Sequence, residues 1–206
     1  MIAPSQPDKG ISVTRILILQ GHPDASRSHL CHALADAYER GAIERGHDIR
    51  ALDVAKLDFP LLCSEEEWLH GALPAELAPA QTAIAWCQHL VIVFPLWLGG
   101  MPERLKGFLE QVARPGFAFK AAEANPFAAK ALTGRSARVI VTMGMPALVY
   151  RWYFRAHSVK ALERSILGFV GFAPIHETLI GGVAQLSEAQ RTRWFERLRA
   201  LGRAAQ

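Results

Sequence analysis

The chain has 206 residues, of which half are hydrophobic and 20% are charged, and its formal net charge is +4. This composition is typical of one ordinary globular domain with a full hydrophobic core, and it excludes a low-complexity or intrinsically disordered chain. The mild positive charge is compatible with an anionic ligand but does not identify one.

The first residues contain no apolar run of signal-peptide length, so we expect a disordered leader over 1–12 and a single domain over 13–206. The longest apolar run, Leu90–Leu98, is far shorter than the ~20 residues that cross a bilayer, so no membrane insertion is expected. The three cysteines lack C-x-x-C spacing, which disfavours a disulfide framework or a metal site and favours a cytoplasmic location.

Hydrophobic periodicity predicts five strands that alternate with helices. Short apolar runs are typical of strands buried on both faces of a parallel sheet, whereas alternation of apolar and polar residues indicates an outer strand. The predicted strands are Ile16–Leu19, Asp48–Val54 (the alternating one), His89–Phe94, Ala137–Thr142 and Ile175–Ile180.

Capping signals mark several of the expected helices. Gly46 is a stop signal, Pro102 suits a first turn, and Ser187–Gln190 has capping-box spacing. Lys56–Ala78 is predicted as a loop with a short helix, and Arg114–Arg135 is expected to wrap the site or a partner. The helices are expected from about Ser28 to Arg45, Pro79 to Gln88, Glu103 to Ala113, within Val149 to Phe169, and from Ser187 to about Ala200.

This alternation implies a three-layer α/β fold with a parallel, doubly wound sheet and right-handed crossovers. The pattern fits the strand order 2-1-3-4-5, although other doubly wound sheets would fit the bare pattern too. That order brings the loops after Gln20, Phe94 and Thr142 together at the carboxyl edge, where such sheets bind ligands. The first of these loops is rich in hydroxyls and imidazoles and opens a helix, whose unpaired N–H groups favour an anion.

Familiar nucleotide signatures are missing from the sequence. There is no G-x-G-x-x-G, no G-x-x-x-x-G-K-[ST] and no H-E-x-x-H, which disfavours a Rossmann dinucleotide site, a P-loop and a zincin. A phosphate must therefore be held by side chains and by the first helix. The arginine-rich final helix lacks an aromatic platform, so we interpret it as a solvated face and expect no nucleic-acid partner.

Three ordered motifs carry a resemblance to a known family. They are Gly21-His22-Pro23 with Ser28, Phe94-Pro95-Leu96-Trp97 with Met101-Pro102 and Leu105-Lys106-Gly107, and Arg114-Pro115-Gly116-Phe117-Ala118-Phe119. Together they resemble the flavodoxin-like NAD(P)H:quinone oxidoreductases, a family that includes DT-diaphorase and many bacterial quinone reductases. The likeness extends from about Arg15 to Gly182 and implies a flavodoxin-like fold with a flavin site.

The resemblance implies a phosphate-binding role for the first loop. His22 matches a histidine beside the flavin phosphate or pyrophosphate, and Ser28 matches a hydroxyl that donates to the same group. Cys31 stands where related sequences commonly carry asparagine, and a thiol is a weaker donor than an amide. Phosphate binding would then lean on Ser26, Arg27 or His29.

Two further loops would contact the isoalloxazine ring by the same resemblance. One consists of Pro95, Leu96, Trp97 and Leu98, where Trp97 would stack on the ring, line the quinone pocket or serve as a core residue. The other consists of Thr142, Met143, Gly144 and Met145. The corresponding loop of DT-diaphorase is richer in threonine and glycine, so contacts at the pyrimidine end would differ.

Tyr150 and His157 are the catalytic candidates, because the family can place a tyrosine and a histidine near the flavin. There they stabilise charge on the reduced ring or deliver a proton to the quinone. Tyr153 competes with Tyr150 for this role. The alternative is a structural aromatic cluster with Trp152 and Phe154.

The implied activity is two-electron, ping-pong transfer from NAD(P)H through the flavin to a quinone. The resemblance favours FAD, with FMN possible, and leaves NADH against NADPH open. It also implies a homodimer in which each active site is completed by the neighbouring chain. The alternatives are azo- or nitro-compound reduction, a regulatory subunit of a potassium-efflux system, and a flavin-free structural module.

Overall fold

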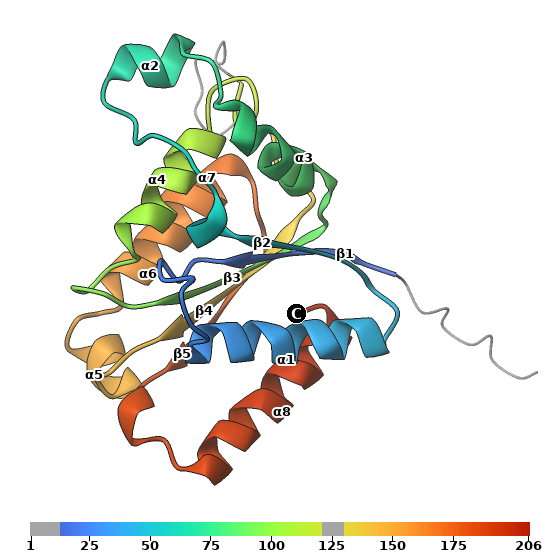
Figure 1. Ribbon diagram of the computed structural model, residues 1–206, viewed down its shortest axis with the longest axis vertical. Coiled ribbons are helices and arrows are strands. Elements are labelled where there is room, and N and C mark those ends of the chain that lie inside the picture. The colour runs from blue at the N-terminus through green and yellow to red at the C-terminus, as the bar shows by residue number, and fades with distance from the viewer. Residues whose placement is uncertain (1–12, 121–129) are drawn as a thin grey trace, which may run out of the picture.

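The computed structural model describes residues 13–120 and 130–206. Its five strands form one parallel sheet in the order β2-β1-β3-β4-β5 (Figure 1), which confirms the predicted strand order. The expected leader over 1–12 and the middle of Arg114–Arg135 lie outside the described residues. The strands are β1 (Arg15–Gln20), β2 (Asp48–Asp53), β3 (His89–Pro95), β4 (Ser136–Thr142) and β5 (Ile175–Ile180).

Helices connect the strands on both sides of the sheet. The α-helices are α1 (Leu30–Glu44), α2 (Glu65–His70), α3 (Ala78–Trp86), α4 (Glu103–Val112), α5 (Ala147–Trp152), α6 (His157–Ala161), α7 (Gly168–Val170) and α8 (Glu188–Ala204). Three short 3₁₀ turns, η1 (Val54–Lys56), η2 (Ala75–Leu77) and η4 (Val183–Gln185), and one π-helical stretch, η3 (Leu162–Leu167), complete them. Within the part of the chain that the structure describes, no helix is both long and apolar enough to cross a bilayer.

The sheet is buried on both faces, as its short apolar strands predict. In β1, Ile16 and Ile18 pack toward α1 and α8, whereas Leu17 and Leu19 pack toward the layer that contains α3, α4, α6 and α7 (Figure 1). All four side chains are buried. This alternation divides the core into two apolar layers and leaves the strand ends as the place for polar chemistry.

Two glycines allow α1 and α8 to pack in direct backbone contact. A Cβ on Gly41 would lie 1.9 Å from the carbonyl oxygen of Arg199, and a Cβ on Gly202 would lie 2.0 Å from that of Tyr38. Glu44 of α1 forms ion pairs with both Arg199 and Arg203 of α8. The first and last helices are therefore locked together across one face of the sheet.

Several helix boundaries differ from the sequence-based expectation, among them those of the first and last helices. The first helix begins at Leu30 rather than near Ser28, because the loop before it is held by its own side-chain hydrogen bonds. The final helix continues to Ala204 rather than ending at about Ala200, since its last turns pack against α1. The Ser187–Gln190 capping box is present as predicted.

His89 is a buried imidazole at the start of β3, 1% exposed. Its Nδ1 lies 2.7 Å from the Ser136 hydroxyl, and its ring stacks on Tyr38 with a centroid distance of 6.3 Å. Burial, reinforced by the nearby positive charge of Arg138, lowers the pKa of His89 to about 4. The native protein therefore favours the neutral imidazole.

This burial makes stability depend on pH. Between about pH 6.5 and pH 4 the unfolded chain binds a proton at His89 that the native chain does not bind, so the free energy of unfolding falls as the pH falls. We expect His89 to account for a loss of about 3 kcal/mol between pH 7 and pH 4. Urea unfolding of the wild type and His89→Gln across this range measures it, with the exposed His70→Gln as control. Equal pH dependence in wild type and His89→Gln would contradict this account.

Candidate functional site

The carboxyl ends of β1, β3 and β4 meet at one edge of the sheet. The Gly21 N–H donates to the Val93 carbonyl at 2.7 Å, and the Leu96 N–H donates to the Thr142 carbonyl at 2.7 Å. A side chain at position 21 would clash with Leu105, because a Cβ there would lie 2.7 Å from its Cδ2. The three loops that leave these strands are therefore neighbours, as the predicted strand order requires.

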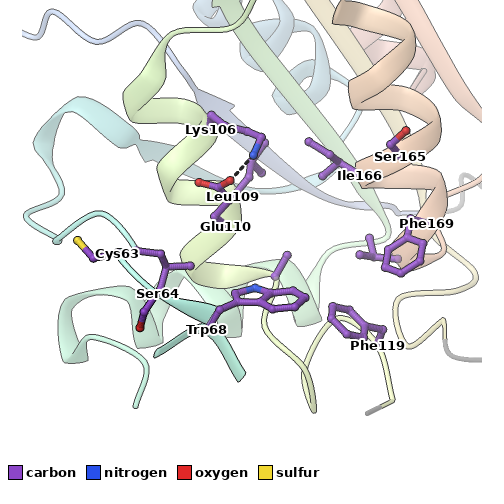
Figure 2. A pocket seen from close by; sticks show the side chains of 13 residues that line it. Cys63, Ser64, Trp68, Lys106, Leu109, Glu110, Phe119, Ser165, Ile166 and Phe169 are labelled. Carbon is purple, nitrogen blue, oxygen red and sulfur yellow. Dashed lines mark hydrogen bonds and ion pairs between the residues drawn. The ribbon is translucent and has the colours of Figure 1, made fainter. Parts of the chain in front are cut away.

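Two hollows lie along α4. One, of about 520 Å³, is lined by Trp97, Leu98 and Met101 beside the strand ends. The other, of about 530 Å³, is lined by aromatic rings and by the Lys106–Glu110 ion pair of α4. Figure 2 shows the rings of this second hollow next to one another, with Trp68 5.7 Å from Phe119 and Phe119 5.5 Å from Phe169 between centroids. The two hollows share Leu62, Lys106 and Glu110 in their walls.

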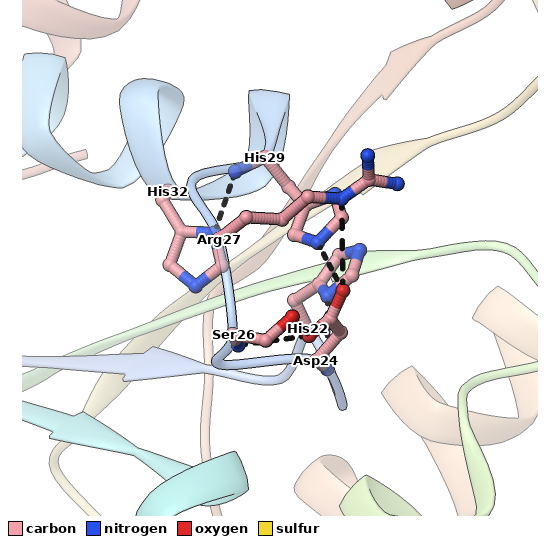
Figure 3. Close-up of polar contacts among 6 residues, drawn as sticks. All are labelled: His22, Asp24, Ser26, Arg27, His29 and His32. Atoms are coloured by element: carbon pink, nitrogen blue, oxygen red, sulfur yellow. Dashed lines mark hydrogen bonds and ion pairs between the residues drawn. The ribbon is translucent and has the colours of Figure 1, made fainter.

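The loop after β1 is organised around the carboxylate of Asp24 (Figure 3). One carboxylate oxygen accepts from the Ser26 backbone N–H at 2.8 Å and from the Ser26 hydroxyl at 2.5 Å. The other lies 2.8 Å from His29 Nε2 and 3.8 Å from Arg27 Nε. Hydrogen bonds from the Ser26 hydroxyl and backbone N–H, and then from His29, hold the pKa of Asp24 well below its usual range. The loop thus gathers several anion donors around one permanently charged group.

His22 adds another donor to this loop. Its Nδ1 accepts the Asp24 backbone N–H at 3.1 Å, so the proton of the neutral ring lies on Nε2. Burial, together with repulsion from His29 and His32, lowers the pKa of His22. The ring stacks on His29 with a centroid distance of 3.8 Å and an interplanar angle of 17°. His22 therefore presents a neutral N–H donor beside the Asp24 cluster.

The structure brings most of the predicted loop residues together. His22, Ser26 and His29 surround Asp24, and Ser28 lies exposed on the same loop. Sequence reasoning missed Asp24 itself, although the spacing Asp24-Ala25-Ser26 is typical of an Asx turn and could have indicated it. It also missed Gln20, whose Oε1 accepts the His22 N–H at 3.1 Å and whose buried Nε2 has no partner among the described residues.

The loop after β3 forms a tight turn that exposes two apolar side chains. Trp97 and Gly100 exchange backbone hydrogen bonds of 2.9 Å, with Leu98 and Gly99 between them at φ values of 45° and 79°. A left-handed backbone is strained for leucine, and its side chain is fully exposed. The Trp97 ring lies 5.9 Å from that of His22, edge-on. Pro95 is buried and Leu96 is half-buried at the base of this turn.

The loop after β4 is joined to α1 by a side-chain contact. The Thr142 hydroxyl lies 3.2 Å from the thiol of Cys31, which joins this loop to α1. Burial raises the pKa of Cys31 to about 11, so the thiol is uncharged near neutral pH. The Met143 side chain is buried in the core, and contact of this loop with a ring stays a prediction. Gly144 is exposed, and a Cβ on it would meet nothing within 4 Å.

Tyr150 is buried where α5 meets α6. It is 1% exposed, its hydroxyl lies 2.6 Å from the Ser158 hydroxyl, and it accepts the Val159 N–H at 3.4 Å. The hydroxyl thus ties α5 to α6, and a catalytic role for Tyr150 stays a prediction. The competing Tyr153 is exposed, and His157 is exposed at the start of α6.

A family model for proteins with the flavodoxin-like fold matches residues 14–201. The chain belongs to this flavodoxin-like family. In such a fold the ligand position is the switch point between the first and third strands, where the Asp24 loop and the Trp97 turn lie side by side. The ligand position expected for this fold thus coincides with the group of anion donors around Asp24.

Relatives of this flavodoxin-like chain include named oxidoreductases. It is 25% identical to an uncharacterized NAD(P)H oxidoreductase of Haemophilus influenzae, over 87% of this chain and 90% of the relative. It is 29% identical to an FMN-dependent NADH:quinone oxidoreductase of Nitratidesulfovibrio vulgaris, over 90% of this chain and 97% of the relative. The solved structure of an NAD(P)H:quinone oxidoreductase from Methanothermobacter marburgensis has a TM-score of 0.76 and 23% identity, covers 93% and 96% of the two chains, and shows the shared fold.

Proposed function

We propose that this chain is a flavin-dependent NAD(P)H:quinone oxidoreductase. The observation that carries the proposal is the group of anion donors around Asp24 at the switch point of a flavodoxin-like sheet. Two relatives that match most of the chain are named as oxidoreductases that use NAD(P)H or NADH. We assign the activity to the cytoplasm, since all three cysteines are unpaired.

The donor set fits the phosphate of a flavin nucleotide. Ser26 offers a backbone N–H and a hydroxyl, His29 and Arg27 offer ring and guanidinium N–H groups, and His22 offers Nε2–H. Phosphate oxygens accept from the same donors that a carboxylate accepts from. The first turn of α1 adds backbone N–H groups and the positive end of the helix dipole. These residues would hold the phosphate.

We propose FMN rather than FAD. The resemblance in the sequence favoured FAD, but the Nitratidesulfovibrio relative is named as FMN-dependent. A hollow of about 440 Å³ beside the phosphate loop is lined by Asp36, Glu39 and Asp53, with Lys56 as its cation. The carboxylates there would repel the second phosphate of FAD. The surroundings of the loop thus suit a single phosphate.

The loops after β3 and β4 would hold the ring, with exposed Gly144 and the Trp97 turn leaving space for it. When bound, a flavin supplies hydride transfer from NAD(P)H to the acceptor. Trp97 and Met101 form an apolar wall for a planar acceptor in the adjoining hollow. We propose His157 as the residue that delivers a proton to the reduced acceptor, because its imidazole is exposed and lies on the segment after β4.

We further propose that a second copy of the chain covers α5. Leu148 and Trp152 lie one helical turn apart on this short helix and are 70% and 76% exposed, and Tyr153 beside them is 80% exposed. Large apolar side chains gathered in this way mark an interface on a globular protein. Since α5 follows the loop of Gly144, a partner bound there would border the site.

The activity has a direct test. We expect the purified protein to be yellow, with a band near ~450 nm, and to release FMN on heating. With a benzoquinone it should oxidise NADH or NADPH with the parallel double-reciprocal lines of a ping-pong reaction. A colourless protein that does not bind flavin would refute the proposal. A yellow protein with negligible turnover would instead favour the regulatory role.

The phosphate loop makes a prediction about charge. Asp24→Asn keeps the shape of the side chain but removes a negative charge beside the proposed phosphate, so FMN should bind about five times more tightly. Binding of riboflavin, which lacks the phosphate, should not change. Flavin fluorescence quenching measures both affinities, and Asp48→Asn at the opposite edge of the sheet is the control. Weaker FMN binding by Asp24→Asn would show that the carboxylate positions the donors instead of competing with the ligand.

The proposed interface predicts the mass of the protein in solution. Light scattering during gel filtration should give twice the chain mass of 22.7 kDa. Trp152→Glu should give a single chain, because a charge cannot be buried in an apolar interface without a partner. Ile43→Glu, at an exposed apolar residue on α1, should leave the mass unchanged. A wild-type monomer with full activity would contradict a shared site.

A further inference from the structure

Arg138 is a nearly buried cation in the first half of β4. Its guanidinium lies between the sheet and α8, and the residue is only 7% exposed. One Nη donates to the Thr178 hydroxyl at 2.8 Å, whereas Nε is buried without a partner among the described residues. No carboxylate in residues 13–120 or 130–206 forms an ion pair with it. A buried charge of this kind requires a counter-charge.

Two other buried polar groups without partners lie on the same face of the sheet, which α1 and α8 cover. They are the hydroxyl of Tyr38 from α1 and Nε2 of His89 from β3, and their rings stack. Burial raises the pKa of Tyr38 and lowers that of His89, and the positive charge of Arg138 acts to lower both. Groups that are both buried and unpaired are rare in folded proteins. This face of the sheet therefore carries several polar groups whose partners are missing among the described residues.

Arg138 opens onto a polar hollow of about 560 Å³ at the β5 edge of the sheet. Its wall carries five cationic side chains and two carboxylates. The cations are Arg138, Arg151, Lys160, Arg164 and Arg197, and the carboxylates are Glu163 and Glu177. Glu177 is already paired with Arg151. The hollow, which we call the Arg138 pocket, therefore has an excess of positive charge.

The Arg138 pocket lies apart from the loops that would hold the flavin. In the register of β4 and β5, Arg138 lies opposite His176, near the start of both strands. The loops that would hold the flavin leave the carboxyl ends of the strands. The remaining walls come from Arg151 of α5, from α6 and η3, and from α8. Because the guanidinium is recessed, the backbone phosphates of a nucleic acid would not reach it. Only a small ligand would do so.

We propose that the Arg138 pocket binds a small phosphate-bearing anion, whose oxygens supply the missing counter-charge. Guanidinium groups match phosphate oxygens with paired N–H donors, and several of them converge here. A doubly charged phosphate suits this excess of cations better than a single carboxylate does. The proposal does not depend on the flavin site.

The test uses the protein both without flavin and with excess FMN, which would occupy the loop at Asp24. Inorganic phosphate and glycerol 3-phosphate are added in separate titrations, with sodium chloride keeping the ionic strength constant. We expect the melting temperature to rise with a saturable dependence, by about 5 °C at a hundredfold excess over the dissociation constant. A response to both compounds identifies a phosphate-ester site, and a response to inorganic phosphate alone identifies a site for the free ion.

Matched variants locate the binding. Arg164→Gln and Arg197→Gln each remove a cation from the pocket wall and should abolish most of the shift in melting temperature. Arg193→Gln, on α8 like Arg197 but outside the pocket wall, should retain the shift. Trp194 provides a second readout, because the Arg197 guanidinium lies 5.2 Å from its ring centroid and phosphate should change its fluorescence. If phosphate raises the melting temperature of the wild type no more than chloride does, the proposal is overturned. An undiminished shift in Arg164→Gln and Arg197→Gln would overturn it equally.

Discussion

The burial of the sheet on both faces is the constraint on which the rest of the structure depends. Side chains of β1, β3 and β4 alternate between two apolar layers, so the middle of the sheet has no room for chemistry. Polar groups are left to the strand ends and to the edge of β5. The loop of Asp24 occupies the first of these places and the Arg138 pocket occupies the second. Both sites are thus consequences of the same packing.

The phosphate site proposed at the loop of Asp24 already contains an internal anion. The Asp24 carboxylate accepts from Ser26 and His29, which are the donors that an external anion would use. A phosphate that enters must compete with the Asp24 carboxylate for these donors. Free phosphate gains little from such an exchange, whereas a nucleotide that also fills the space beside Trp97 gains contacts elsewhere. If the loop is the phosphate site proposed here, it favours ligands with an attached ring.

The sheet could be predicted from the sequence because burial of both faces, the physical constraint, is also what makes the strand sequences apolar. Runs such as Ile16–Leu19 and Leu90–Phe94 are apolar at every position because both of their faces are buried. Tyr150 could not be placed in this way. Its partner Ser158 is brought back by a turn in which Arg155 and Ala156 both have left-handed backbones, and neither residue signals such a turn. Asp24 is different, because the spacing to Ser26 signals an Asx turn, whereas its contact with His29 depends on the local path of the chain.

The contact between α1 and α8 has a consequence for how the protein is made. Gly41 lies in the first quarter of the chain, and the backbone that covers it belongs to Arg199. During synthesis the amino-terminal half emerges first, so the backbone contact with α8 forms only after α8 has been made, although α1 already covers part of that face of β1. Until then the apolar surface that α8 covers stays exposed, a state in which chaperones and self-association compete.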